Sequence, residues 1–163
     1  MPKHLIGVMG PGSGAGPLVE QTAYALGEQI ARHGWVLLTG GRNVGVMNAA
    51  SRGAQSAGGL TVGILPTTDI TALSSAVDIA ILTDLGNARN NVNILSSHVV
   101  VACGMGLGTV SEVALALKAG KPVMLMQVAP GVITFFEKLS THPLAATDSV
   151  LTAIAWIESQ LRG

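Results

Sequence analysis

Residues 99–117 read VVVACGMGLGTVSEVALAL, and this stretch decides the fold class. An apolar, β-branched run precedes a loop with glycines at 104, 106 and 108, and a helical pattern follows it. A glycine loop between a strand and a helix exposes backbone N–H groups at the positive end of the helix dipole. The stretch therefore predicts a strand–loop–helix unit with a built-in anion site.

Apolar runs alternate with helical patterns along the rest of the chain. Strands without polar alternation are typical of a parallel sheet covered on both faces. We therefore expect a Rossmann-like, doubly wound α/β fold of six to seven parallel strands flanked by helices, in a single domain over residues 1–163. The predicted strands are 5–9, 35–39, 61–65, 79–83, 99–102 and 123–127, and the predicted helices are 17–33, 46–57, 89–95, 109–119, 132–139 and 150–161.

Small residues recur in the predicted helices. Ala49, Ala50, Gly53 and Ala54 lie close together in one of them, and Gly27 interrupts another. Glycine inside a helix costs about 1 kcal/mol relative to alanine, so we expect a packing reason for it.

The composition indicates a protein that buries part of its surface against copies of itself. Hydrophobic residues make up 48% of the chain, charged residues 11%, and the formal net charge is zero. Ordinary soluble domains are about 25% charged. No apolar run reaches the roughly 18 residues of a membrane span, which predicts that the protein does not cross a membrane. The absence of a basic run argues against a nucleic-acid partner, and we expect a homo-oligomer.

Cysteine and histidine usage limits the metal and redox chemistry. A single cysteine, Cys103, excludes an internal disulfide and favours a reducing compartment. The N-terminus lacks signal-peptide features, so we expect a cytoplasmic protein, although a mature organellar protein would look the same. Cys103 is interpreted as a buried apolar residue, or alternatively as a soft contact to a metal centre. The four histidines lack metal-ligand spacing, so no structural zinc site is expected.

Four glycine- or asparagine-rich loops follow predicted strands, at 10–16, 39–45, 86–93 and 104–112. The carboxyl ends of parallel strands share one edge of the sheet, so all four loops can line one crevice. Neither the dinucleotide spacing G-x-G-x-x-G nor the P-loop pattern occurs. The loops predict a site for an extended anionic ligand, with phosphate as a small occupant. Its predicted residues are Gly10, Gly12, Ser13, Gly40, Gly41, Arg42, Arg89, Asn90, Gly104, Met105, Gly106, Gly108, Thr109 and Glu112.

Glu112 has two interpretations. In the first, Thr109-Val110-Ser111-Glu112 is a capping box, in which Thr109 accepts the N–H of residue 112 and Glu112 reaches back to the N–H of Thr109. That arrangement needs no ligand. In the second, Glu112 is a general acid/base or binds a sugar hydroxyl.

The other polar residues of these loops also have two interpretations. Arg89 is expected to pair with a phosphate or carboxylate, or else to be a solvated residue at a helix start, and the same holds for Arg42. Ser13 and Thr109 are candidate phosphate donors. The asparagines could read a heterocycle edge or a ribose, or could be ordinary turn and cap residues. They are Asn87, Asn90, Asn91 and Asn93.

With these loops in place, the chain resembles the Lonely Guy superfamily of Rossmann-like, lysine-decarboxylase-like proteins. The resemblance rests on Gly40-Gly41 followed by Gly45-Val46-Met47, on Arg89, and on the run 106–109 with Glu112. Within the superfamily the chain is most similar to the molybdenum cofactor carriers of algae and cyanobacteria. The stretches that match them are 6–12, 33–42 and 104–118.

The resemblance to the carriers implies a homotetramer that binds molybdenum cofactor, protects it from oxidation and passes it to molybdoenzymes such as nitrate reductase. The cofactor is a phosphorylated pterin dithiolene whose own sulfurs hold the metal, so no protein metal ligands are expected. The resemblance also adds molybdate, beside phosphate, as a small occupant of the anion site.

Enzymes of the same superfamily hydrolyse nucleoside 5′-monophosphates, which makes a phosphoribohydrolase using Arg89 and Glu112 the alternative. Their loop begins Pro-Gly where this chain has Gly104-Met105, and Asn90 stands where they carry lysine. These departures favour the non-enzymatic carrier. A nucleotide-sensing module without turnover is a third hypothesis.

Overall fold

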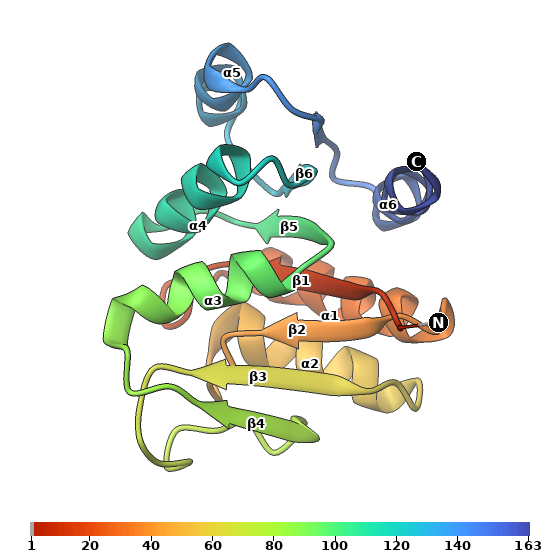
Figure 1. Cartoon of the computed structure of the whole chain (residues 1–163). Coiled ribbons are helices and arrows are strands. Elements are labelled where there is room, and N and C mark those ends of the chain that lie inside the picture. The colour runs from red at the N-terminus through yellow and green to blue at the C-terminus, as the bar shows by residue number, and fades with distance from the viewer. Residues whose placement is uncertain (1) are drawn as a thin grey trace.

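The computed structural model describes residues 2–163 and contains one seven-stranded parallel sheet between two layers of helices (Figure 1). The expected doubly wound α/β fold is confirmed. The strands are β1 (Leu5–Met9), β2 (Val36–Thr39), β3 (Thr61–Leu65), β4 (Ile79–Leu82), β5 (Val99–Cys103), β6 (Val123–Met126) and β7 (Leu144–Ala146). The helices are α1 (Pro17–Arg32), α2 (Gly45–Ser56), α3 (Arg89–Ser96), α4 (Leu107–Lys118), α5 (Pro130–Leu139) and α6 (Val150–Arg162), with a short 3₁₀ turn, η1 (Gly86–Ala88), before α3.

Each face of the sheet carries its own apolar core. Helices α1, α2 and α6 pack on one face, against Ile6, Val8 and Val101 among others. Helices α3, α4 and α5 pack on the other face, against residues such as Val100 and Ala102. In Figure 1, α3 lies in front of the sheet and α1 and α2 lie behind it. Strands buried on both faces explain why the sequence shows continuous apolar runs instead of alternation.

Glycines allow α1 and α2 to pack at very short distance. A Cβ atom at Gly27 would lie 2.0 Å from the carbonyl oxygen of Ala50, and one at Gly53 would lie 1.9 Å from that of Tyr24. Both contacts are with backbone atoms, which cannot rotate away. The predicted packing reason for Gly27 is therefore confirmed.

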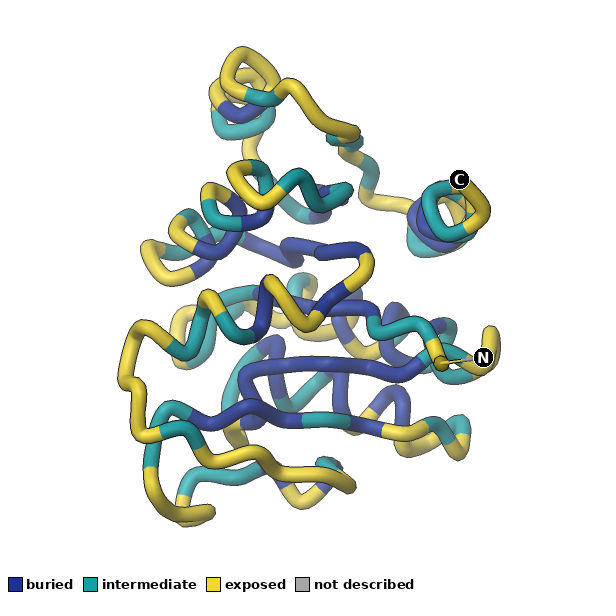
Figure 2. The backbone as a smooth tube through the Cα atoms, viewed as in Figure 1, coloured by how far each residue is buried: buried dark blue, intermediate teal, exposed yellow. Residues whose placement is uncertain are grey.

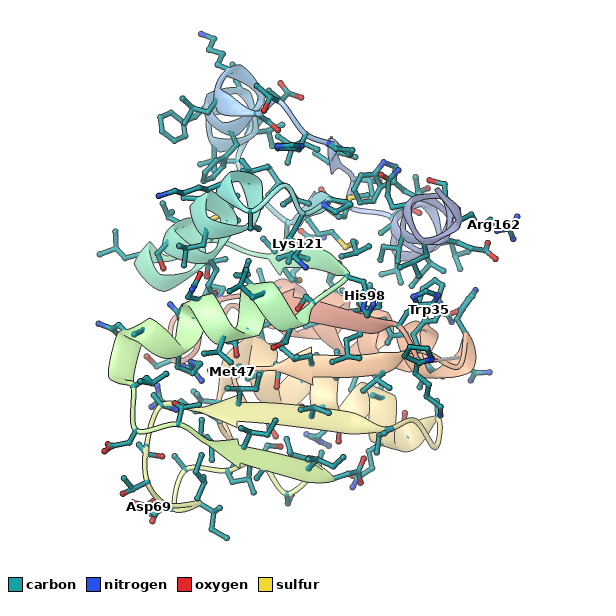
Figure 3. The ribbon with its side chains drawn as sticks, viewed as in Figure 1. Trp35, Met47, Asp69, His98, Lys121 and Arg162 are labelled. Atoms are coloured by element: carbon teal, nitrogen blue, oxygen red, sulfur yellow. The ribbon has the colours of Figure 1, made fainter. Side chains whose placement is uncertain are left out.

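The order of the strands places the site. From one edge it is β4-β3-β2-β1-β5-β6-β7, so the chain builds outward from β1 in one direction and then restarts at β5 in the other. A crevice opens at such a switch point, beyond the carboxyl ends of the strands. In Figure 3, Met47 lies toward that end of the sheet, and Trp35 and His98 lie toward the opposite end.

The structure corrects several predicted boundaries. Strand β7 was not predicted, and it is only three residues long. Helix α4 begins at Leu107, two residues before the predicted start, and α5 also begins two residues early, at Pro130. Figure 2 shows the central strands buried and the outer strand β4 exposed. Within residues 2–163, no helix is both long and apolar enough to cross a bilayer.

Candidate functional site

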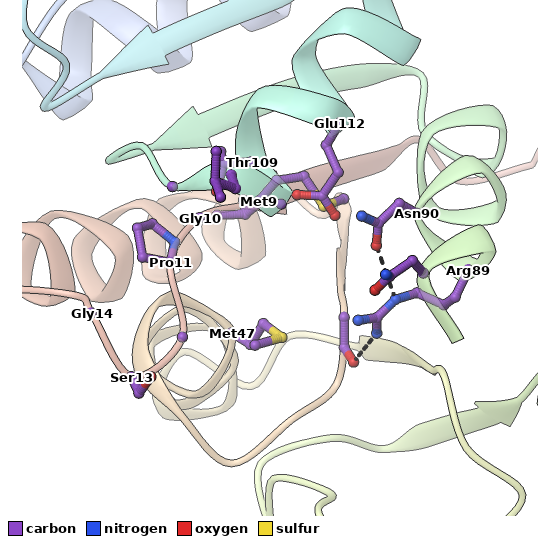
Figure 4. Close-up of a pocket in the computed structure, with 17 residues that line it drawn as sticks. Met9, Gly10, Pro11, Ser13, Gly14, Met47, Arg89, Asn90, Thr109 and Glu112 are labelled. Carbon is purple, nitrogen blue, oxygen red and sulfur yellow. Dashed lines mark hydrogen bonds between the residues drawn. The ribbon is translucent and has the colours of Figure 1, made fainter. Parts of the chain in front are cut away.

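A pocket of about 360 Å³ opens at the switch point between β1 and β5 (Figure 4). The loops after β1, β4 and β5 contribute to its wall, together with Gly40 after β2 and Met47 of α2. Ten of the predicted site residues line it: Gly10, Gly12, Ser13, Gly40, Arg89, Asn90, Gly106, Gly108, Thr109 and Glu112. The pocket therefore brings together residues from all four predicted loops.

The loop after β1 packs closely against its neighbours because of two glycines, Gly10 within it and Gly45 at the start of α2. A Cβ at Gly10 would lie 2.3 Å from the carbonyl oxygen of Cys103, at the end of β5. Gly45 has φ +54°, and a Cβ there would lie 2.1 Å from the carbonyl oxygen of Gly12. The backbone of the β1 loop is thus held against β5 and the start of α2, which leaves its outer side facing the pocket.

The amino end of α4 supplies anion donors. Gly106 is the N-cap, with extended backbone angles of φ −149° and ψ 174°, and no side chain caps the helix. The first helical bond runs from Val110 N–H to Gly106 O, at 2.8 Å. The backbone N–H groups at the start of the helix have no intrahelical acceptor, and they carry the positive end of the dipole. A Cβ at Gly108 would meet nothing within 4 Å, so the space beside these N–H groups is open.

The predicted capping box is wrong. Because α4 starts at Leu107 with Gly106 as its N-cap, Thr109 lies within the first turn and Glu112 in the second, and neither side chain makes a capping hydrogen bond. Thr109 is 2% exposed and Glu112 8% exposed, and both line the pocket. The position of Glu112 is therefore explained by the pocket and not by the helix end.

Glu112 is held in an unusual electrostatic environment. Burial raises its pKa to about 7, while the Arg89 charge and the Asn93 side chain oppose that rise. The pKa of Glu112 is higher in the folded protein than its ordinary value. Its contribution to the free energy of unfolding is therefore greatest below pH 4.5 and is lost as pH rises through 7. At neutral pH the carboxyl group is thus a mixture of acid and carboxylate.

Arg89 ties three parts of the site together. Its Nη1 donates to Gly40 O, at 2.7 Å, and to Ile64 O, and its Nε donates to Asn90 Oδ1, at 3.3 Å. Burial lowers its pKa, and Glu112 partly restores it. Neither ion pair of the described residues joins Arg89 to Glu112, so the two groups attract each other at longer range. Arg89 thus positions the carboxyl ends of β2 and β3 and places positive charge in the pocket.

We expect Arg89→Ala to destabilise the protein by about 2–3 kcal/mol, because it leaves the carbonyls of Gly40 and Ile64 without their charged donor. Urea unfolding at fixed protein concentration measures this. Arg32→Ala is the matched control, since Arg32 makes only an exposed ion pair with Glu28 and should cost under about 1 kcal/mol. Equal losses in the two variants would contradict the anchoring role.

The predicted asparagines divide into two groups. Asn87 and Asn90 line the pocket. Asn91 is exposed outside it, and Asn93 is fully buried, with its Nδ2 3.9 Å from the sulfur of Met9 and its Oδ1 without a hydrogen-bond partner within residues 2–163. Two asparagine side chains can therefore face a ligand.

Several pocket residues were not predicted. Most of them are apolar, and apolar residues do not indicate a binding site in a sequence. They are Val8, Met9, Pro11, Gly14, Met47 and Leu107. Met47 could have been found from its place in the first turn after the second glycine loop. Leu107 is 93% exposed at the rim.

Four predicted site residues do not line the pocket: Gly41, Arg42, Gly104 and Met105. Arg42 is exposed, and its charge lowers the pKa of Arg89. Cys103 is fully buried in the apolar core, where burial raises the pKa of its thiol to about 12, with a further contribution from Asp148. The interpretation of Cys103 as a buried apolar residue is confirmed, and Cys103 is not among the residues that line the pocket.

Comparison with known proteins places this fold and pocket in a family. The model of the SLOG cluster4 family matches residues 3–154. The structure of the molybdenum cofactor binding protein from the phototrophic bacterium Rippkaea orientalis is 56% identical, with a TM-score of 0.96 and 99% of both chains covered. The molybdenum cofactor carrier protein of Chlamydomonas reinhardtii is 50% identical, with a TM-score of 0.94, over 99% of this chain and 100% of that one.

A shorter stretch of the chain is similar to an enzyme. The cytokinin riboside 5′-monophosphate phosphoribohydrolase of Mycobacterium marinum is 44% identical over 50 residues, which cover 31% of this chain and 27% of that protein. The match to the two cofactor-binding proteins is thus full-length, and the match to the hydrolase is partial.

Proposed function

The chain belongs to the SLOG cluster4 family, and from that premise we propose that it binds, protects and passes on molybdenum cofactor without catalysing a reaction on it. The observation that carries the proposal is the full-length similarity to two proteins named for this cofactor, at 50–56% identity. That similarity spans every loop that lines the pocket. The molybdenum is cargo held by the pterin's own sulfurs, and the protein binds the organic part.

The pocket has the chemistry that such a ligand needs. The start of α4 offers backbone donors to a phosphate group, and Thr109 and Ser13 add hydroxyl groups. Asn87 and Asn90 can read the edge of a heterocycle. A second hollow of about 720 Å³ adjoins the pocket along α4 and shares Asn87, Asn90, Leu107 and Gly108 with it. A phosphate and a bicyclic ring system could therefore occupy neighbouring compartments.

Transfer tests the carrier role. We expect protein purified from a cofactor-producing host to restore activity to cofactor-free nitrate reductase. Protein from a host unable to make the cofactor is the control and should restore none. A pterin-loaded protein that never activates the reductase would limit the function to storage and contradict transfer.

The alternative is a phosphoribohydrolase. The observation in its favour is that Arg89 and Glu112 line one pocket, and a carboxyl group with a pKa of about 7 suits a general acid. Release of adenine from AMP or of isopentenyladenine from its riboside monophosphate, lost in Glu112→Gln, would overturn the carrier proposal. Tight binding of AMP without turnover would instead favour a nucleotide sensor.

We further propose that the protein is a homotetramer in the cytoplasm that meets molybdoenzymes transiently. Large apolar side chains are exposed over several elements: Ile70, Ile79, Leu107, Phe135, Leu139 and Leu151. Such a number of exposed large apolar side chains supports self-association. The single cysteine supports a reducing compartment. Sedimentation showing a stable monomer would contradict this assembly.

A further inference from the structure

The electrostatics of the pocket rest on two groups. Among the residues that line it, Arg89 and Glu112 are the only ones with ionisable side chains. With Glu112 neutral the pocket carries one positive charge, and with Glu112 ionised the two formal charges cancel. A single proton therefore decides whether the pocket is charged to receive an anion.

Burial disfavours the carboxylate form of Glu112, and this effect outweighs both the Arg89 charge and the hydrogen bond from the Asn93 side chain, which favour that form. Glu112 is only 8% exposed, and its side chain points into the pocket between Thr109 and Arg89 (Figure 4). The guanidinium of Arg89 donates to Gly40 O, Ile64 O and Asn90 through Nη1 and Nε, and neither ion pair of the described residues joins it to Glu112. The carboxyl oxygens face the space that the ligand would fill.

No other acidic side chain lies on the described elements that surround Glu112. On α3, which packs against α4, Arg89 is the only charged side chain, and Asn93 is the nearest polar one. On α4 itself the other charged side chain is Lys118, at the far end of the helix. Strands β1 and β5 carry no ionisable residue on the pocket wall, and exposed Arg42 acts on Arg89.

We propose that Glu112 binds the anionic ligand as the neutral acid, donating a hydrogen bond to it, so that capture of the cofactor takes up a proton from solvent. The inference rests on the proposed function and names the regulation of that same site. Binding transfers one proton from water to a Glu112 oxygen, and release returns it. A Glu112 that loses its proton becomes a carboxylate beside the bound anion and expels it.

Thermodynamic linkage gives the size of the effect. Since burial places the pKa of free Glu112 at about 7, about nine-tenths of the protein is neutral there at pH 6 and only a few per cent at pH 8.5. If the neutral form alone binds, affinity falls on the order of 30-fold between those two pH values. Sulfate is a suitable probe because it stays a dianion throughout this range, so any pH dependence belongs to the protein.

The experiment is calorimetric titration of the full-length protein with sulfate, at about pH 6 and pH 8.5, in buffers of different ionisation enthalpy. We expect proton uptake per sulfate to approach one at the higher pH and zero at the lower, with affinity falling on the order of 30-fold. Glu112→Gln keeps a hydrogen-bond donor and removes the titration. It should bind sulfate equally at both pH values, with no proton uptake.

Glu158→Gln is the matched control, because Glu158 forms an exposed ion pair with Arg162 and should leave the wild-type pH dependence intact. Wild-type affinity that does not change with pH, or a Gln variant that still takes up a proton, would overturn the inference. If the protein binds the cofactor but its affinity does not change with pH, the proton coupling is wrong and the carrier role stands. If sulfate binding takes up a proton but the purified protein contains no cofactor, the carrier role is wrong and the proton coupling stands.

Discussion

Gly108→Val should weaken oxyanion binding at least tenfold while the protein stays folded. Gly108 is the second residue of α4 and lines the pocket. A β-branched side chain there would fill the space through which the ligand approaches the backbone N–H groups. A Cβ at this position meets nothing within 4 Å, so the fold itself has no reason to fail. Sulfate titration measures the affinity, and circular dichroism confirms the fold.

The matched control for this variant is Gly131→Val. Gly131 is the second residue of α5, and a Cβ there also meets open space. The control therefore carries the same change in helix propensity, a gain of a few tenths of a kcal/mol (roughly 0.3) for valine over glycine, at a helix start outside the pocket. Unchanged sulfate affinity in Gly108→Val would place the anion elsewhere on the molecule.

Gly27→Ala should destabilise the protein by about 3 kcal/mol, against the direction that helix propensity predicts. Alanine at an interior helical position normally gains about 1 kcal/mol over glycine. Here the new methyl group would overlap the carbonyl oxygen of Ala50, and relief requires α1 and α2 to move apart. Urea unfolding at fixed protein concentration shows whether the substitution lowers or raises the free energy of unfolding.

Gly131→Ala separates packing from propensity. Because its methyl group enters open space, the variant should be unchanged or stabilised by up to about 1 kcal/mol. A Gly27→Ala protein as stable as wild type would show that the α1–α2 contact is looser than the structure describes.

The architecture was predictable where strands are long and buried. Continuous apolar runs such as 99–103 indicate a parallel sheet, and glycine loops mark the ends of its strands. Strand β7 was missed because Leu144-Ala145-Ala146 carries no β-branched residue and is only three residues long. The start of α4 was misplaced because Thr109 looks like an N-cap, whereas an extended glycine at 106 takes that place.

The sequence predicted which glycines and polar residues belong to the site, but it did not predict their hydrogen-bond partners. The resemblance pointed to Arg89 and Glu112, and both line the pocket. The partners of Arg89 lie 25 and 49 residues away in sequence, as carbonyl groups, and no residue type signals them. Met47 was missed because a methionine in a helix is typical of a core residue, and only the fold turns it toward the crevice.

We propose that one molecule of molybdenum cofactor occupies the pocket at the start of α4. The direct measurement is the content of molybdenum and pterin per chain in wild type, Gly108→Val and Gly131→Val, all purified from a cofactor-producing host. We predict that wild type and Gly131→Val contain both in equal, stoichiometric amounts, and that Gly108→Val contains much less of both. Wild-type protein without pterin, or Gly108→Val with the full amount, would contradict the claim.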